Sequence, residues 1–305
     1  MRAAVSPDTS MRPRTSLSRR ILGLLAALFL SSLARADAAL HSFWEVHGKH
    51  NTVYLLGSIH VLRPSDYPLP QPVLEAYARS KALVMEIDLD ELNDPHTQSE
   101  LLAAATLPEG QSLHTVLGEQ RYAHAESLAK EIGVNLEMFD RFAPWFAAEA
   151  IEQLQLAQLG FKPESGVEMY FKERARTDSK AVTGLESAAD QIGVFAGMPL
   201  DTQSEYLIAS LEEARELPKD VDAMVSAWRR GDSRWFESEL QSEFGKDQRL
   251  YETLLGARNR RWLPKIEALL NEDRDYLVIV GSAHLMGRGN VIELLKKDGI
   301  GATQR

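Results

Sequence analysis

A tetrapeptide of the form Gly-Ser-x-His occurs twice in the chain. The first copy ends at His60 and the second at His284, and short apolar runs precede them at residues 52–56 and 276–280. Such runs suit strands that are buried on both faces of a parallel sheet. Each glycine lets the chain turn sharply as it leaves its strand. Both imidazoles are therefore expected at the carboxyl edge of the sheet, where ligands bind in open α/β folds.

A carboxylate interrupts a third apolar run. Glu86 lies within residues 82–89, and burying a carboxylate is costly unless it is paired or binds a metal. His60, His284 and Glu86 are thus a plausible set of three metal ligands, with one position open for water. A bound ion lowers the pKa of such a water from about 16 to near 7 and polarises a substrate carbonyl. The alternative is that Glu86 simply ends its strand in solvent.

The two serines of the motifs, Ser58 and Ser282, are candidates to hydrogen bond near the histidines and fix their tautomers. A metal-free alternative uses His60 as a base and either serine as the nucleophile, although neither lies in a Gly-x-Ser-x-Gly turn. The chain has no cysteine, which excludes disulfides, thiolate metal sites and a cysteine nucleophile. A metal would be held by His, Asp or Glu, which favours zinc, manganese, cobalt or iron.

Glu168, Glu186 and Arg258 are further candidates for catalysis. Glu186 ends residues 180–187, predicted as another parallel strand, where it could act as a base, serve as a ligand or stabilise the next helix. Glu168 is a second candidate base, or equally the acid of a capping box that Ser165 opens. Arg258 belongs to a basic cluster that is either a solvated helix face or a source of one arginine that stabilises a developing oxyanion.

The remaining pattern predicts an α/β fold with a central, mostly parallel sheet flanked by helices. A hairpin is expected over residues 42–56, leading into the first motif. Residues 93–160 are predicted to form a large helical insertion and residues 200–270 a second helical region. Because no low-complexity linker divides the chain, residues 37–305 are expected to form a single domain.

The first 36 residues have the features of a secretory signal peptide. Four arginines within residues 12–20 precede an apolar stretch at residues 21–34, and Ala34-Arg35-Ala36 fits a small-x-small cleavage site. The apolar stretch is short for a membrane span, and an uncleaved anchor is the alternative. Arg19-Arg20 leaves twin-arginine export open beside the general route. A periplasmic or secreted location is therefore expected.

The chain that follows the predicted signal is strongly acidic. It keeps 28 basic and 43 acidic residues, a net charge of −15. Such a charge makes nucleic acid and anionic membrane surfaces poor candidates for partners. No later stretch of the sequence is long and apolar enough to span a bilayer.

These motifs resemble those of the TraB/GumN family, which includes the TIKI metalloproteases. The resemblance extends over nearly the whole chain after the signal, and its motifs lie at residues 54–61, 67–70, 82–88, 184–186, 258–262 and 281–284. It implies a fold like that of the erythromycin-esterase and ChaN-like group, with a site at the rim of the sheet. It also implies metal-dependent hydrolysis of peptide bonds, with manganese or cobalt as the expected ion and zinc as a third candidate.

By motif, the resemblance assigns the site to His60, Glu86 and His284, and it matches Glu186 and Arg258 to further family positions. The leading hypothesis is an exported metal-dependent hydrolase, a peptidase that acts on a peptide or protein substrate. The alternative is a non-enzymatic periplasmic protein that binds or sequesters a peptide, haem or metal at the same rim. Stoichiometric binding without turnover would distinguish this alternative.

Overall fold

The computed structural model describes residues 40–244 and 248–305, and the predicted signal peptide lies outside them. Six strands form one sheet in the order β4-β3-β5-β2-β1-β6. β2, β3, β4 and β5 are parallel to one another, whereas β1 is antiparallel to both β2 and β6. The predicted α/β class with a mostly parallel sheet is therefore confirmed. The strands are β1 (Phe43–His47), β2 (Thr52–Ser58), β3 (Ala82–Met85), β4 (Ala181–Gly184), β5 (Tyr276–Gly281) and β6 (Ala302–Gln304).

The strands that the apolar runs form lie at the centre of the sheet, where another strand flanks each of them on both sides. β5 lies between β3 and β2, and the four residues 277–280 are fully buried. In the parallel register of β2 and β5, Gly57 lies opposite Val280 and Ser58 lies opposite Gly281. His60 and His284 therefore both come after the carboxyl ends of parallel strands, as expected, and these two strands are neighbours in the sheet.

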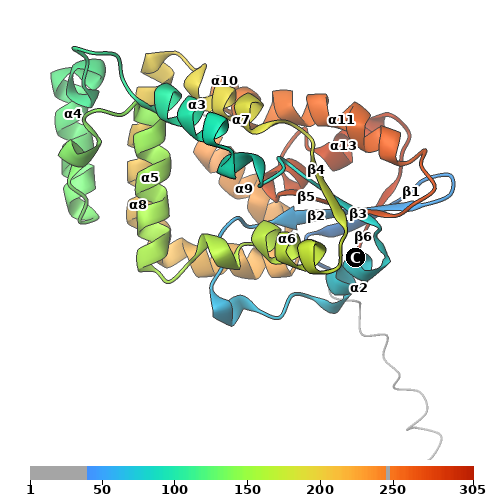
Figure 1. The fold of residues 1–305 in the computed structure, drawn as a ribbon. Coiled ribbons are helices and arrows are strands. Elements are labelled where there is room, and N and C mark those ends of the chain that lie inside the picture. The colour runs from blue at the N-terminus through green and yellow to red at the C-terminus, as the bar shows by residue number, and fades with distance from the viewer. Residues whose placement is uncertain (1–39, 245–247) are drawn as a thin grey trace, which may run out of the picture. The chain divides into compact units, whose positions relative to one another are not determined.

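Parallel strands need crossover connections, and helices supply most of them. Figure 1 shows α2 and α6 on one side of the strands and α11 and α13 on the other. Two short helices, α7 and α12, begin directly after residues of the candidate site. The bounds are α2 (Gln71–Arg79), α6 (Val167–Thr177), α7 (Ala188–Ala196), α11 (Ala257–Leu269), α12 (Ala283–Met286) and α13 (Val291–Lys297).

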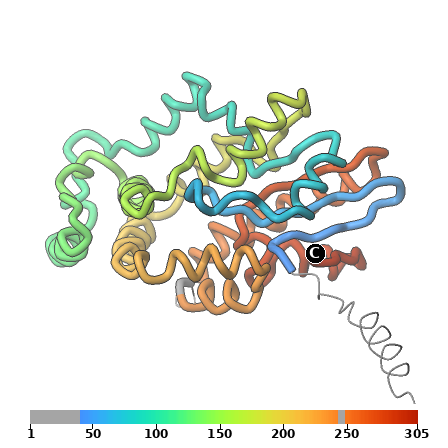
Figure 2. The backbone as a smooth tube through the Cα atoms, turned by 90° about the horizontal axis from the view of Figure 1, so that it is seen from below, coloured from blue at the N-terminus to red at the C-terminus, as the bar shows by residue number. Residues whose placement is uncertain are grey.

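The two predicted helical regions are helical in the structure. They contain α3 (Pro95–Ala105), α4 (Leu113–Glu131), α5 (Pro144–Gln158), α8 (Leu200–Arg229), α9 (Ser233–Phe244) and α10 (Gln248–Tyr251). α4, α5 and α8 share an apolar core of their own, which includes Leu128, Ile151 and Leu207. Figure 2 shows α4 and α5 at the end of the fold away from the β1–β2 hairpin. Across the described ranges, no helix is both long and apolar enough to cross a membrane.

Two local predictions are wrong. The strand expected over residues 82–89 ends at Met85, so Glu86 lies just past a strand end, as the two histidines do. Ser165 does not cap α6, because the helix begins at Val167 after Gly166 and has no side-chain cap. A side chain on Gly166 would collide with the carbonyl oxygen of His60, so this tight contact, and not a capping box, fixes the start of α6.

Gly57 should be essential for the close approach of the two motifs. A methyl group built on Gly57 would lie 3.0 Å from Ser282 Oγ and 3.2 Å from Ser282 Cα, which is backbone. We expect Gly57→Ala to lower the free energy of unfolding by about 1–3 kcal/mol in urea denaturation, as overpacking does. Gly301→Ala is the matched control, because no atom lies within 4 Å of its added methyl. Equal effects of the two variants would contradict this account.

Candidate functional site

The two Gly-Ser-x-His motifs are hydrogen bonded to each other. The backbone N–H and the hydroxyl of Ser282 both donate to the carbonyl oxygen of Ser58, at 3.0 and 2.8 Å. The Ser58 hydroxyl donates to Oε1 of Glu168. Both serines are buried, and their hydroxyls donate to Glu168 and to the backbone rather than to a histidine in the described part of the chain. The hypothesis of a serine nucleophile beside His60 therefore has no support in the geometry, and Ser58 acts on His60 only through Glu168.

His60 is held at one nitrogen and open on the other side. Its Nδ1 donates to Oε1 of Glu168 at 2.8 Å, and 64% of its side chain is exposed. The Glu168 carboxylate raises the pKa of His60 to about 10. The other oxygen of Glu168 is buried and has no hydrogen-bond partner among the described residues. Glu168 is therefore an orienting partner of His60 and not a helix cap.

His284 is enclosed. Its Nδ1 lies 2.6 Å from the amide oxygen of Asn259, its Nε2 lies 3.2 Å from Nη1 of Arg258, and its ring packs 4.3 Å from that of Trp262. An amide oxygen and a guanidinium nitrogen can only accept and donate respectively, so Nδ1 carries the proton and Nε2 accepts. Burial lowers the pKa of His284 to about 3, and the ring is neutral at neutral pH.

Glu86 is buried and paired, so the alternative of a solvated strand end is wrong. Its Oε2 accepts from Nη2 of Arg258 at 2.6 Å and from Gln191 at 3.2 Å. Its Oε1 accepts from the N–H of Gly281 at 2.7 Å and lies 3.8 Å from Nε2 of His284. Burial alone would raise the pKa of Glu86, but the neighbouring His284, Arg258 and His60, together with the N–H of Gly281, hold it below its ordinary value.

Glu186 holds Arg258 in place. Its Oε1 accepts from Nε and Nη2 of Arg258 at 2.9 and 2.6 Å, and its Oε2 accepts from the Trp262 indole at 3.1 Å. Ser187 and Asp190, not Glu186, form the capping box of α7. Arg258 is likewise not on a solvated helix face, because only 6% of it is exposed.

Three contacts of this cluster were missed by sequence reasoning: Asn259, Gln191 and Trp262. Arg258 and Trp262 are four residues apart and therefore share a helix face, a signal that was present in the sequence. The structure also shows a π-helical turn at Glu252–Gly256, immediately before Arg258. Such turns often occur at functional sites, and this one precedes Arg258 and Asn259, which both hydrogen bond with His284.

Gly281 marks the point where the predicted ligands meet. A methyl group built there would lie 3.2 Å from Glu86 Oε1, 3.5 Å from His60 Nε2 and 3.7 Å from His284 Cδ2. The side chains of His60, Glu86 and His284 thus border the position that a Cβ atom on Gly281 would take, here called the notch. In both rings Nδ1 is tied to an acceptor, which leaves Nε2 as the possible ligand atom, the arrangement that orients metal-binding histidines. Nε2 of His60 faces Gly281, whereas Nε2 of His284 faces Arg258.

The donor atoms are of types that bind divalent transition ions, but the distances between them are too long for all three to coordinate one ion. In the described part of the chain, no three His, Asp or Glu side chains are close enough together to hold a metal as they stand. A metal would take the proton's place on His60 Nε2 and would require Arg258 to move away from His284. The types of the donor atoms fit the ion, whereas their present spacing and the position of Arg258 oppose it.

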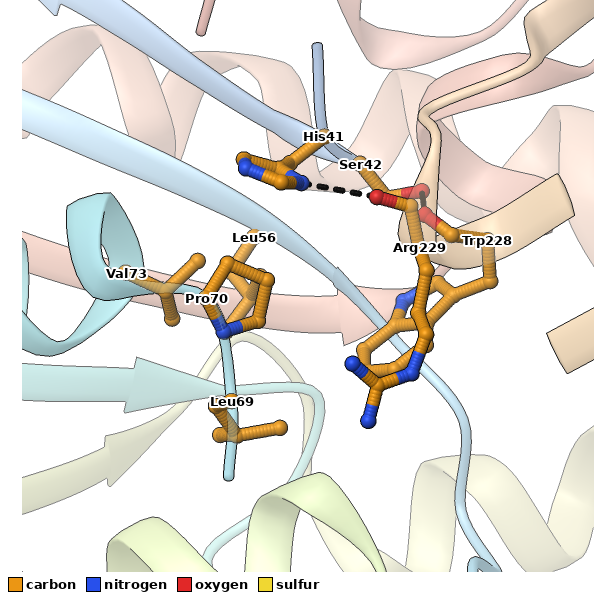
Figure 3. Close-up of a pocket in the computed structure, with 8 residues that line it drawn as sticks. All are labelled: His41, Ser42, Leu56, Leu69, Pro70, Val73, Trp228 and Arg229. Atoms are coloured by element: carbon orange, nitrogen blue, oxygen red, sulfur yellow. Dashed lines mark hydrogen bonds between the residues drawn. The ribbon is translucent and has the colours of Figure 1, made fainter. Parts of the chain in front are cut away.

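A small apolar pocket is lined by a separate set of residues (Figure 3). His41 points into it and its Nδ1 lies 2.7 Å from the carbonyl oxygen of Arg229. The lining residues are His41, Ser42, Leu56, Leu69, Pro70, Val73, Trp228 and Arg229. None of the candidate site residues lines this pocket.

Comparison with known protein families identifies one family whose model matches this chain. The model of the TraB/PrgY/gumN family matches residues 42–304, which is most of the chain. The sequence is similar to the protein YbaP of Escherichia coli (strain K12), with 27% identity over 80% of this chain and 87% of YbaP. No solved structure matches the chain, so the expected likeness to erythromycin esterases and ChaN stays a prediction.

Animal proteins are also similar over most of the chain. Metalloprotease TIKI2 of Xenopus tropicalis is 24% identical over 88% of this chain and 60% of its own length. Metalloprotease TIKI1 of Homo sapiens is 22% identical over 86% of this chain and 62% of its own length. The chain therefore spans less than two thirds of these animal relatives.

Because His284 is buried, we expect its imidazole to titrate well below the ordinary pKa of 6.5. The pKa of His284 is lowered to about 3 in the folded state, so the unfolded chain binds a proton on this ring more readily. The free energy of unfolding therefore falls as the pH drops below 6.5. In NMR spectra of ¹⁵N-labelled histidine, we expect His284 to remain the Nδ1–H tautomer from pH 5 to pH 8.

Asn259→Asp is the matched variant, because it keeps the shape of the partner and adds a negative charge beside Nδ1. A carboxylate there should raise the pKa of His284 and bring its titration into the measured range. A wild-type His284 resonance that titrates with a midpoint near 6.5 would contradict a buried, neutral His284 ring.

Proposed function

The chain belongs to the TraB/PrgY/gumN family, and from that premise we propose that it is an exported, metal-dependent hydrolase that cleaves peptide bonds. The meeting of Glu86 Oε1 with His60 Nε2 and the His284 ring around Gly281 carries the proposal. The names of the TIKI metalloproteases support the reaction class. The composition of residues 1–36 supports export to the periplasm or beyond.

His60, Glu86 and His284 would hold the ion, for which we propose manganese or cobalt, with zinc as a third candidate. When bound, the ion supplies an acidified water and polarises the substrate carbonyl. Glu168 and Asn259 orient the two rings through their Nδ1 atoms. Such orienting partners are worth 10- to 100-fold in metal affinity or activity in other enzymes, on the order of the effect expected here.

A peptide substrate would reach the site from the side of His60. This ring is 64% exposed, whereas the side chains of His284 and Glu86 are covered. His60 is therefore the proposed ligand that a substrate would meet first.

A methyl group in the notch should separate function from folding. We expect Gly281→Ala to reduce metal binding and peptide cleavage by at least about tenfold, because the methyl fills the space that the three donors surround. The free energy of unfolding should change by less than about 1 kcal/mol, since the nearest atom is the end of the Glu86 side chain. Gly301→Ala again serves as the control. Full activity of Gly281→Ala would exclude this notch as the site.

Removal of metal should abolish cleavage. We expect chelator treatment of the purified protein to stop hydrolysis of a peptide library, and Mn²⁺ or Co²⁺ to restore it, read by mass spectrometry. His60→Ala and His284→Ala should each lose at least about 100-fold in activity, because even orienting partners cost up to that much. His96→Ala is the control, because this histidine is exposed on α3. Stoichiometric ligand binding without any product would instead favour a sequestering protein.

A further inference from the structure

Arg258 is a buried cation at the centre of the candidate site. Its guanidinium contacts both Glu86 and Glu186 at 2.6 Å and packs 4.7 Å from the Trp262 ring. Only 8% of its side chain is exposed. Two buried carboxylates therefore surround one buried guanidinium, and Oε1 of Glu86 accepts from the N–H of Gly281 at 2.7 Å.

Two of the three proposed metal ligands are in contact with this arginine. Nη2 donates to Oε2 of Glu86, and Nη1 lies 3.2 Å from Nε2 of His284. Because Nδ1 of His284 carries a proton and donates it in a hydrogen bond to Asn259, the lone pair on Nε2 is the only one that this ring can offer. Arg258 therefore occupies the same lone pair that a metal requires.

The arginine has an anchor that does not depend on those ligands. Nε and Nη2 both donate to Glu186 Oε1, and Nη1 also donates to the carbonyl oxygen of Leu254 at 3.1 Å. Release of His284 would therefore leave Arg258 tied to Glu186 and to its own helix. A small movement about this anchor would suffice to free Nε2.

We propose that Arg258 competes with the metal ion for His284 and Glu86, and so sets the affinity of the site for the ion. The proposal rests on the metal-dependent function proposed above. A guanidinium next to a divalent ion in a buried site repels it, so every binding event must displace Nη1 from His284. Arg258 is thus an internal cation that keeps the buried carboxylates paired whenever the ion is absent and weakens the binding of the ion.

The test is the affinity for Mn²⁺, measured by isothermal titration calorimetry on chelator-treated full-length mature protein. We expect Arg258→Gln to bind Mn²⁺ at least about tenfold more tightly than the wild type, because the competing charge is gone. Arg258→Lys keeps the charge and should stay within about threefold of the wild type. Arg261→Gln is the matched control, because Arg261 contacts Glu186 at 3.5 Å from the same helix without touching Glu86 or His284.

A second variant separates competition from a simple gain of negative charge. Arg258→Gln combined with Glu186→Gln removes the cation together with its anchoring carboxylate, so the net charge of the site is unchanged. We expect this double variant to bind Mn²⁺ more tightly than the wild type as well, since Nε2 of His284 is free. It also guards against unfolding of the single variant, because no unpaired carboxylate is added, and thermal denaturation of each variant verifies the fold.

The outcomes are distinct. Affinity of Arg258→Gln equal to or below that of a metal-binding wild type overturns the competition and leaves the metal-dependent function standing. A double variant that returns to the wild-type affinity also overturns it, because charge alone would then explain the gain. If neither the wild type nor any variant binds Mn²⁺, Co²⁺ or Zn²⁺, the competition and the metal-dependent function both fall.

Discussion

The two hydrogen bonds from Ser282 to the carbonyl oxygen of Ser58 fix the geometry on which the candidate site depends. They join the ends of β2 and β5 at the point where both strands stop pairing. A slip of one residue would turn every side chain to the opposite face, and it would separate the two histidines. Gly57 has no side chain because Ser282 packs directly against it. The Gly-Ser part of each motif thus holds the ends of β2 and β5 together, and the histidines remain available for chemistry.

The repeated motif does not produce a symmetric site. The first histidine pairs with a carboxylate and is largely open, whereas the second pairs with an amide and is covered. A neighbouring carboxylate favours the protonated ring, and burial beside a neutral amide disfavours it. His60 is therefore positive and His284 neutral at neutral pH. The partners on α6 and α11, not the motif, decide the charge of each ring.

Much of this arrangement follows from the sequence, for a physical reason. Short runs that are apolar throughout can only be stable when they are covered, which predicts the central strands and the neighbouring positions of β2 and β5. Glu86 was identifiable because a carboxylate in such a run needs a partner. The capping box at Ser165 failed because local patterns compete with distant contacts, here between Gly166 and the carbonyl oxygen of His60. Asn259 and Gln191 gave no signal, since a neutral amide costs little on a helix surface.

The same distinction explains why the charges of the site are harder to predict than its location. Glu86, Glu186 and Arg258 are each 6% exposed, and breaking a buried pair of this kind typically costs about 3–5 kcal/mol. Each of these charges must therefore find the others, yet the sequence does not say which carboxylate Arg258 will join. Because the guanidinium reaches Glu186, Glu86 and His284 at once, it stabilises the acids and occupies an imidazole lone pair with the same group. Stability of the buried charges and readiness to bind an ion are consequently opposed in this fold, and Arg258 sets the balance between them.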